Sequence, residues 1–132
     1  MKKLSAVIIT LNEEDRLEDA LKSCTDIADE IVVLDSFSTD KTCEIAAAYN
    51  AKIYKNKFID YGSQKNTALE KASHEWILNL DADERVSDHL KKEILAFKQK
   101  KKNDADDEVD GFRINRKTFY LDRWIKHSGW YP

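Results

Sequence analysis

The sequence predicts an α/β domain in which a mostly parallel sheet is covered by helices on both faces. Short apolar, β-branched runs alternate with segments whose apolar residues recur at the spacing of a helix face. The connections between successive apolar runs are long enough to hold a helix, as parallel strands require. With 132 residues, the chain is long enough for one domain with a substantial core.

The first half of the chain contains the clearest strand and helix patterns. Residues 4–11 form a β-branched run that is typical of a buried strand. Helical spacing follows in the apolar residues Leu17, Ala20, Leu21 and Cys24. A second strand is expected at 31–34, ending at Asp35, and a second helical face at 42–49.

The same alternation continues in the second half. A short strand is predicted at 52–54, a helix with its inner face at 65–72, and a strand at 76–80. Ser87 is a suitable N-cap for a fourth helix, whose inner face would contain the apolar residues Leu90, Ile94 and Phe97. A last strand is expected at 110–119, with Phe112 and Ile114 on one face.

A charged segment and an aromatic tail end the chain. Residues 98–110 are almost entirely polar, which predicts a surface loop. Aromatic residues crowd the region after it: Phe112, Phe119, Tyr120, Trp124, Trp130 and Tyr131. Such a surface normally packs on something. It either completes a core or a partner surface with residues outside this chain, or it is a sugar-stacking platform beside a substrate cleft.

The composition indicates a soluble globular domain, with 42% hydrophobic and 36% charged residues and a net charge of −3. No long basic stripe with interleaved aromatic residues is present, which disfavours nucleic acid as a partner. The first apolar run is too short to span a membrane, so a cytoplasmic protein is expected. Peripheral contact with the inner face of the membrane stays open, as does a homodimer formed through the aromatic tail.

Three predicted strands end in polar clusters. Residues 12–14 follow the first strand, 35–40 the second and 81–84 the fourth. In a parallel sheet these clusters would meet at one edge, where α/β proteins bind ligands. Each cluster alone could be a helix start or a solvated loop. Asp81 and Asp83 are the most informative, because paired carboxylates suit a divalent cation that carries a diphosphate.

In their order along the chain, four motifs resemble family 2 glycosyltransferases: SAVIITLNEE at 5–14, VLDSFSTDKT at 33–42, QKN at 64–66 and LDAD at 80–83. Within that family, the tail at 119–132 is similar to the lipopolysaccharide-core glucosyltransferase branch. The resemblance implies the GT-A fold. It also implies transfer of a sugar with inversion, from a nucleotide donor expected to carry UDP, to a glycan or glycolipid acceptor.

The resemblance also implies roles for single residues. The base and ribose pocket would be lined by Thr10, Leu11, Asn12 and Glu14. Asp35 would accept a hydrogen bond from the base, and Lys65 would face the diphosphate. Asp81 would contact the ribose or the water shell of the metal, and Ala82 would belong to the same donor site. Asp83 would bind Mg²⁺ or Mn²⁺ directly, and the metal would neutralise the leaving diphosphate.

Two positions depart from the family pattern, and one function is unassigned. Phe37 and Ala68 stand where many members have smaller residues, so the loop after Asp35 and the packing near the diphosphate are expected to differ. An inverting transfer also needs a general base. Asp110, Asp122 and His127 lack a supporting motif, and the base is expected beyond Pro132. Residues 111–132 would then begin the acceptor side of a longer domain that starts at residue 1.

Three other functions fit less well or stay open. A sugar-phosphate nucleotidyltransferase would need a glycine-rich loop after the first strand, and the three glycines of this chain, at 62, 111 and 129, lie elsewhere. A phospho-acceptor signalling domain would need an acidic pair directly after that strand. A nucleotide-sugar-binding module without catalysis differs from the enzyme only in the missing base.

Overall fold

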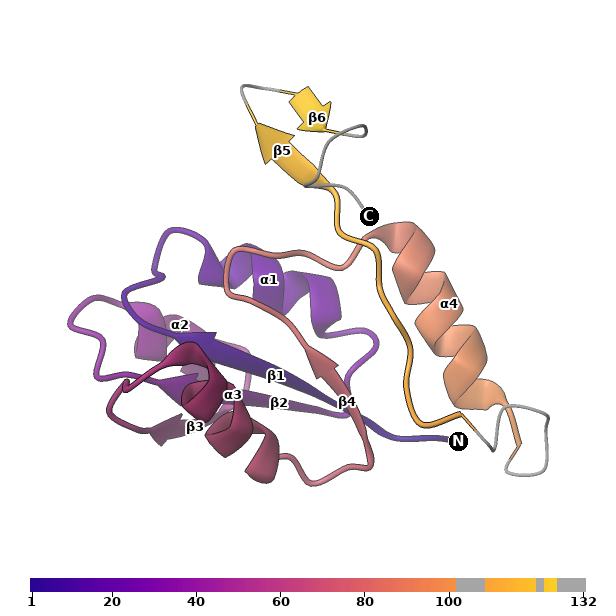
Figure 1. Cartoon of the computed structure of the whole chain (residues 1–132), viewed down its shortest axis with the longest axis horizontal. Helices are drawn as coiled ribbons and strands as arrows, with labels where there is room; N and C mark the ends of the chain where they lie inside the picture. The colour runs from indigo at the N-terminus through magenta and orange to yellow at the C-terminus, as the bar shows by residue number, and fades with distance from the viewer. Residues whose placement is uncertain (102–108, 121–122, 126–132) are drawn as a thin grey trace. The chain divides into compact units, whose positions relative to one another are not determined.

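Four strands form a single parallel sheet in the order β3-β2-β1-β4 (Figure 1). The strands are β1 (Leu4–Thr10), β2 (Glu30–Asp35), β3 (Lys52–Lys55) and β4 (Trp76–Asn79). The computed structural model describes residues 1–101, 109–120 and 123–125. It divides into two units, residues 1–101 and residues 102–132, and the sheet lies in the first. The prediction of a parallel α/β sheet is confirmed.

The strand order creates a switch point between β1 and β4. The chain adds β2 and then β3 on one side of β1, and returns to place β4 on the other side. In register, Thr10 at the end of β1 pairs with Asp35 at the end of β2, and Val7 pairs with Asn79 of β4. The connections after β1 and β4 therefore leave in opposite directions, which opens a crevice at the carboxyl ends of these strands.

Helices cover both faces of the sheet (Figure 1). The helices α1 (Leu17–Cys24) and α2 (Thr42–Ala48) pack on one face, and α3 (Tyr61–Glu70) packs on the other. The alternation of β1 explains the two cores, because Ala6 and Ile8 join the α1 side whereas Val7 joins Ala68 of α3. α3 begins four residues before Lys65 and ends before Ala72, so its predicted position was shifted along the chain.

The fourth helix, α4 (Asp88–Gln99), begins as predicted at Ser87. The Ser87 hydroxyl accepts a hydrogen bond from the Leu90 amide at 3.2 Å. Phe97 packs edge-on against Trp76, with ring centroids 4.6 Å apart. The prediction that residues from 98 onward form a surface loop is wrong for Lys98, which is buried within α4. Its ammonium donates to the Ile27 carbonyl and the Asp29 carboxylate, both at 2.7 Å.

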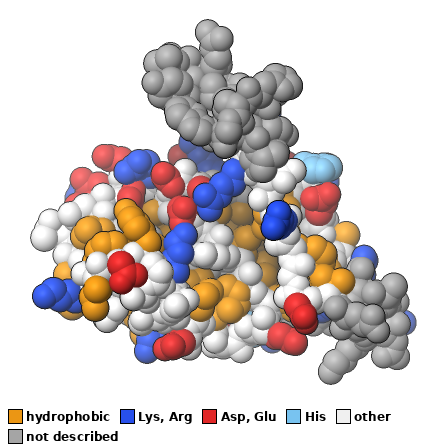
Figure 2. Space-filling view, in the orientation of Figure 1, with side chains coloured by type: hydrophobic (Ala, Val, Ile, Leu, Met, Phe, Trp, Pro, Cys, Tyr) orange, Lys and Arg blue, Asp and Glu red, His pale blue; other side chains and the backbone are white. Residues whose placement is uncertain are grey.

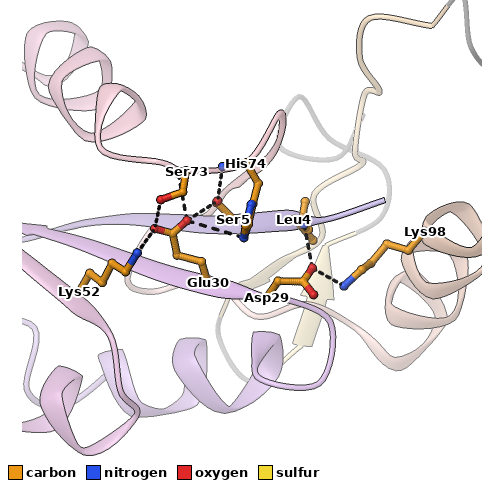
Figure 3. Close-up of polar contacts among 8 residues, drawn as sticks. All are labelled: Leu4, Ser5, Asp29, Glu30, Lys52, Ser73, His74 and Lys98. Carbon is orange, nitrogen blue, oxygen red and sulfur yellow. Dashed lines mark hydrogen bonds and ion pairs between the residues drawn. The ribbon is translucent and has the colours of Figure 1, made fainter. Parts of the chain in front are cut away.

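A buried carboxylate joins several elements at the amino end of the sheet (Figure 3). Glu30 of β2 accepts hydrogen bonds from the Ser5 hydroxyl at 2.8 Å and from the Ser73 amide and hydroxyl at 3.0 Å. Lys52 of β3 adds an ion pair at 3.0 Å. This network lies at the opposite end of the strands from the crevice, so its role is structural.

The second unit contains the strands β5 (Thr118–Tyr120) and β6 (Arg123–Ile125), which pair antiparallel. The prediction of a strand from residue 110 is wrong for its first part, because residues 109–117 have no regular structure. The predictions for residues 102–108, 121–122 and 126–132, including Asp122 and His127, lie outside the described residues. Among the described helices, none combines the length and apolarity of a membrane span.

Candidate functional site

Two adjoining cavities lie at the carboxyl ends of β1 and β4. One has a volume of about 200 Å³ and the other about 320 Å³. Both are lined by Ile9, Glu13 and Tyr61, so they form one cleft. The smaller cavity extends toward the end of β2 and the start of α3, and the larger toward the loop after β4. The cleft therefore lies at the switch point, where the strand order predicts a ligand.

The larger cavity is charged. Its charged lining residues are Glu13, Arg16, Lys65, Asp81 and Asp83. Two ion pairs connect four of them: Lys65 Nζ lies 3.1 Å from Asp81 Oδ1, and Arg16 Nε lies 3.1 Å from Glu13 Oε2. Because three carboxylates face two basic groups, the cavity has an excess of negative charge. A diphosphate would be repelled there unless a further cation entered with it.

The loop after β4 contains three carboxylates, of which two line the charged cavity. Glu84 closes a turn, since its carboxylate accepts from the Asp81 amide at 2.9 Å and its own amide donates to the Asp81 carbonyl at 3.0 Å. Ala82 is buried by this turn, whereas Asp83 is exposed. Glu84 is thus held by the backbone of the loop, and Asp81 and Asp83 are the carboxylates of this loop that line the cavity.

Two carboxylates suit a cation that takes its other ligands from a substrate. Over the described part of the chain, no group of three or more His, Cys, Asp or Glu side chains is arranged to hold a metal ion alone. Mg²⁺ and Mn²⁺ are commonly bound by one or two carboxylates together with phosphate oxygens and water. The donor set at Asp81 and Asp83 fits this kind of shared site.

The smaller cavity is largely uncharged. Besides the residues that it shares with its neighbour, it is lined by Thr10, Leu11, Ser36, Phe58 and Gln64. Gln64 is buried and joins two walls of the cavity, because its amide donates to the Ser36 hydroxyl at 3.0 Å and its carbonyl accepts from Asn56 at 3.1 Å. This mixture of apolar walls and few polar groups is typical of small-molecule sites.

Asp35 lies beneath the cleft rather than in its lining. It is fully buried, and both carboxylate oxygens accept hydrogen bonds. Oδ1 accepts from the Thr10 hydroxyl at 2.7 Å and the Ser38 hydroxyl at 2.5 Å, and Oδ2 accepts from the Ser38 amide at 2.8 Å. Burial alone would raise the pKa of Asp35, but the hydrogen bonds from Ser38 and Thr10 outweigh it and lower the pKa. These hydrogen bonds hold the start of the loop after β2 against the end of β1, and the contact of Asp35 with the base stays a prediction.

Asn12 and Glu14 connect the loop after β1 to the loop after β2. The Asn12 side chain accepts from the Thr39 amide at 2.9 Å, and Glu14 accepts from the Lys41 amide at 3.1 Å. Neither lines the two cavities, whereas Thr10, Leu11, Lys65, Asp81, Ala82 and Asp83 do. The structure thus brings six of the nine predicted site residues to the cleft and places Asn12, Glu14 and Asp35 around it.

Several lining residues were not identified from the sequence. They are Ile9, Glu13, Arg16, Ser36, Phe58, Tyr61 and Gln64. Glu13 and Ser36 lie in the polar clusters predicted at 12–14 and 35–40, and Gln64 lies in the QKN motif, although none of the three was given a role of its own. Phe58 lies just before α3 and Tyr61 is its first residue, neither belongs to a distinctive motif, and only the fold brings them to β1. Ala68 packs in the core between α3 and the sheet.

This parallel sheet, with a charged cleft at its switch point, defines a Rossmann-like α/β domain of the GT-A type. S. aureus TarS in complex with UDP-GlcNAc has a similar structure, with a TM-score of 0.63 and 29% identity, over 72% of this chain and 30% of that chain. M. tuberculosis glucosyl-3-phosphoglycerate synthase in complex with Mn²⁺, UDP and glucosyl-3-phosphoglycerate gives a TM-score of 0.56 and 25% identity, over 64% and 36%.

The chain belongs to glycosyl transferase family 2, whose model matches residues 5–131. The lipopolysaccharide core biosynthesis glycosyltransferase LpsC of Rhizobium meliloti is 37% identical over 126 residues, which cover 89% of this chain and 43% of that protein. An uncharacterized glycosyltransferase of Rickettsia bellii is 48% identical over 93 residues, 70% of this chain and 32% of that protein. The chain thus spans about one third to two fifths of these relatives' length.

Proposed function

We propose that this chain binds a UDP-sugar and is the donor-binding part of an inverting glycosyltransferase. The acceptor would be a glycan or a lipid-linked saccharide of the cell envelope, in polysaccharide or lipopolysaccharide synthesis. One observation carries the proposal. Lys65 of α3 and the two aspartates of the loop after β4, Asp81 and Asp83, line one cavity, which adjoins a largely uncharged cavity at the switch point of the sheet.

The two cavities match the two chemical parts of a nucleoside diphosphate. The uncharged cavity would take the nucleoside, with Thr10 and Leu11 in its wall, and the charged cavity would take the diphosphate. Asp83 and Asp81 would hold Mg²⁺ or Mn²⁺ together with phosphate oxygens. A bound cation would supply charge neutralisation for the leaving diphosphate. Lys65, whose ammonium already lies in this cavity, would add a second positive charge.

Related proteins support the choice of donor and metal. TarS has been crystallised with UDP-GlcNAc, and the M. tuberculosis synthase with UDP and Mn²⁺. LpsC is named for lipopolysaccharide core biosynthesis, and its similarity extends over most of this chain. For the present chain, the same donor class, the same kind of metal and an envelope glycan acceptor follow as parts of the proposal.

Calorimetric titration of the 132-residue chain with UDP, with and without Mn²⁺, tests the proposal. We expect UDP to bind with Mn²⁺, and the substitution Asp83→Ala to weaken that binding by on the order of tenfold or more. Glu75→Ala is the matched control, because Glu75 is an exposed carboxylate that does not line the cleft. A wild-type chain that does not bind UDP would contradict the donor assignment. Equal affinity in Asp83→Ala would contradict the metal role.

A binding module without catalysis is the alternative, because no general base has been identified in this chain. Measurement of sugar transfer from UDP-glucose and related donors to core saccharide acceptors distinguishes the two functions. The proposal places the base outside residues 1–132, so we expect the chain alone to bind donor without robust transfer. Robust transfer by the 132-residue chain would show that the base lies within it.

A further inference from the structure

We infer that Phe58 and Tyr61 form an aromatic wall that stacks on the nucleobase of the donor. This inference rests on the proposed function, and it identifies residues that the family motifs do not include. The two rings lie in edge-to-face contact, with centroids 5.1 Å apart and planes at 74°. Both line the smaller cavity, whose charged lining residue is Glu13, and Tyr61 lines the charged cavity as well. Because the two ring planes are nearly perpendicular, one ring can lie face-on to a planar base while the other meets the base with its edge, and both arrangements are favourable between aromatic groups.

Hydrogen bonds fix the backbone of the segment that contains the two aromatic residues. The Asn56 amide donates to the Asp35 carbonyl at 3.0 Å, which extends the pairing of β3 with β2 by one step. At the other end, Asp60 caps α3, and its carboxylate accepts from the Ser63 amide at 2.8 Å and the Ser63 hydroxyl at 2.9 Å. The short segment that presents Phe58 is therefore fixed at both ends. A fixed aromatic ring binds a ligand with a smaller loss of conformational entropy than a mobile one.

The exposure of the two aromatic side chains leaves apolar surface available for a ligand. Tyr61 is 72% exposed although it lies at the cleft, and Phe58 is 37% exposed. Opposite them, Leu11 contributes a further exposed apolar side chain to the same cavity. A planar base between these side chains would cover apolar area on both of its faces, which favours binding.

The distribution of charge determines which part of the donor meets the wall. The lysine and the two aspartates after β4 line only the other cavity. Because the diphosphate needs that charged cavity, the base at the far end of the nucleotide would extend into the uncharged one. The floor of this cavity offers the Ser36 hydroxyl, which already accepts from Gln64 and has its own proton to donate to a base carbonyl.

The experiment compares a ligand with a base and a ligand without one. UDP and inorganic pyrophosphate are titrated, each with Mg²⁺, into the 132-residue wild-type chain and into Phe58→Ala and Tyr61→Ala. We expect UDP affinity to fall about 5- to 150-fold in each variant, the range of base–aromatic stacking, which corresponds to about 1–3 kcal/mol. Pyrophosphate affinity should stay unchanged in Phe58→Ala, because Phe58 lines only the smaller cavity, and it should fall less than UDP affinity in Tyr61→Ala, because Tyr61 also lines the charged cavity. Phe58→Tyr, which keeps an aromatic ring, should retain UDP binding.

Ile59→Ala is the matched control, because Ile59 lies between the two aromatic residues, is 77% exposed and does not line the cleft. If Phe58→Ala fails to fold, Tyr61→Ala still tests the inference. Tyr61 is 72% exposed, so its removal should affect the core little. Two results would contradict the aromatic wall and leave the proposed function intact. One is an unchanged UDP affinity in both Phe58→Ala and Tyr61→Ala, and the other is a loss of pyrophosphate affinity as large as the loss of UDP affinity. Equal affinity of the wild-type chain for UDP and for pyrophosphate would also contradict the stacking role of Phe58 and Tyr61. Failure of the wild-type chain to bind either ligand overturns both.

Discussion

The ammonium of Lys65 lies 3.1 Å from the carboxylate of Asp81, which joins α3 to the loop after β4 across the charged cavity. Both side chains are about one third exposed, so the ion pair contributes little to stability, on the order of 0–1 kcal/mol. Its position matters more than its strength. In the proposed complex, the lysine would turn to the diphosphate and the aspartate to the cation, so that each ligand charge replaces one member of the pair.

Replacement of the lysine should therefore separate binding from stability. We expect Lys65→Met to weaken UDP binding in the presence of Mn²⁺ by about ten- to a hundredfold, the effect of losing one charged hydrogen bond to phosphate. The free energy of unfolding, measured with urea, should change by less than about 1 kcal/mol. Lys92→Met is the control, because Lys92 is exposed on α4. A loss of stability without a loss of UDP affinity would show that the pair is structural.

Asp35 should stabilise the loop after β2, and one substitution tests whether it also contacts the base. Its carboxylate accepts from Thr10 and Ser38 in a buried site. Asp35→Asn places an amide against these donors and should lower the free energy of unfolding by about 1–3 kcal/mol. The ratio of affinities for UDP, ADP and GDP should stay as in the wild type. A variant that is stable but changes this ratio would restore the base contact that the family resemblance implies.

The order of strands and helices in residues 1–101 could be predicted because burial and periodicity coincide. The run from Leu4 to Thr10 is apolar on both faces since helices cover both, and α1 shows one buried stripe. The pattern of α3 is weaker, because only Gln64 and Ala68 are buried in it. Its start, set by the Asp60 cap, was accordingly missed.

The lining residues of the cleft could be predicted only where a charged or polar side chain directly follows a strand. Asp81 and Asp83 follow a strand, and carboxylates at that place are informative. Phe58 and Tyr61 were missed, because an aromatic residue at the start of a helix indicates no site until the fold places it beside β1. Lys98 was misjudged for a different reason. Lysine is rarely buried, and its partners lie about 70 positions away in the sequence.

Charged side chains of both signs are mixed on one face of the molecule (Figure 2). On the face shown in Figure 2, basic and acidic side chains are interspersed, with hydrophobic side chains between them. Such mixing gives no extended field of one sign on that face. Local charge at the cleft, rather than net charge, is what the proposed function uses.

Phe37 adopts a backbone conformation that favours glycine, and a substitution can measure the cost. Its φ is +60°, and its ring lies 5.9 Å from the Lys55 ammonium. The strain of a side chain in the left-handed region is about 1–2 kcal/mol, and an exposed cation–π contact contributes about 0.5–1 kcal/mol. Phe37→Ala removes only the contact, whereas Phe37→Gly removes both.

We therefore expect Phe37→Gly to be more stable than Phe37→Ala by about 1 kcal/mol, and at least as stable as the wild type. Thermal unfolding of the three proteins at one pH gives the comparison. The matched pair Asn50→Gly and Asn50→Ala examines a second residue with positive φ, +57°, outside the cleft. A glycine variant at position 37 that is less stable than the alanine variant would show that the loop is not held in this conformation.

Glu30 gives a prediction for the pH dependence of stability. Burial would raise its pKa, but hydrogen bonds from Ser73, Lys52 and Ser5 outweigh this and lower the pKa to about 2 (Figure 3). A carboxyl group whose pKa is lower in the folded state than its ordinary value of 4.5 stabilises the fold above that ordinary value. This stabilisation is lost as the pH falls from about 4.5 toward 2.

Glu30→Gln keeps the shape of the side chain and removes its charge, so it should abolish this part of the pH dependence. At pH 7 the variant should be less stable by on the order of 3 kcal/mol, and the difference from the wild type should shrink steadily below pH 4.5. Urea unfolding at several pH values between 7 and 2.5 measures both. Glu75→Gln, which changes an exposed carboxylate, should leave the wild-type profile unchanged. A constant difference between Glu30→Gln and the wild type over this range would mean that the cost is one of packing. The charge network at the amino end of the sheet would then contribute nothing that depends on pH.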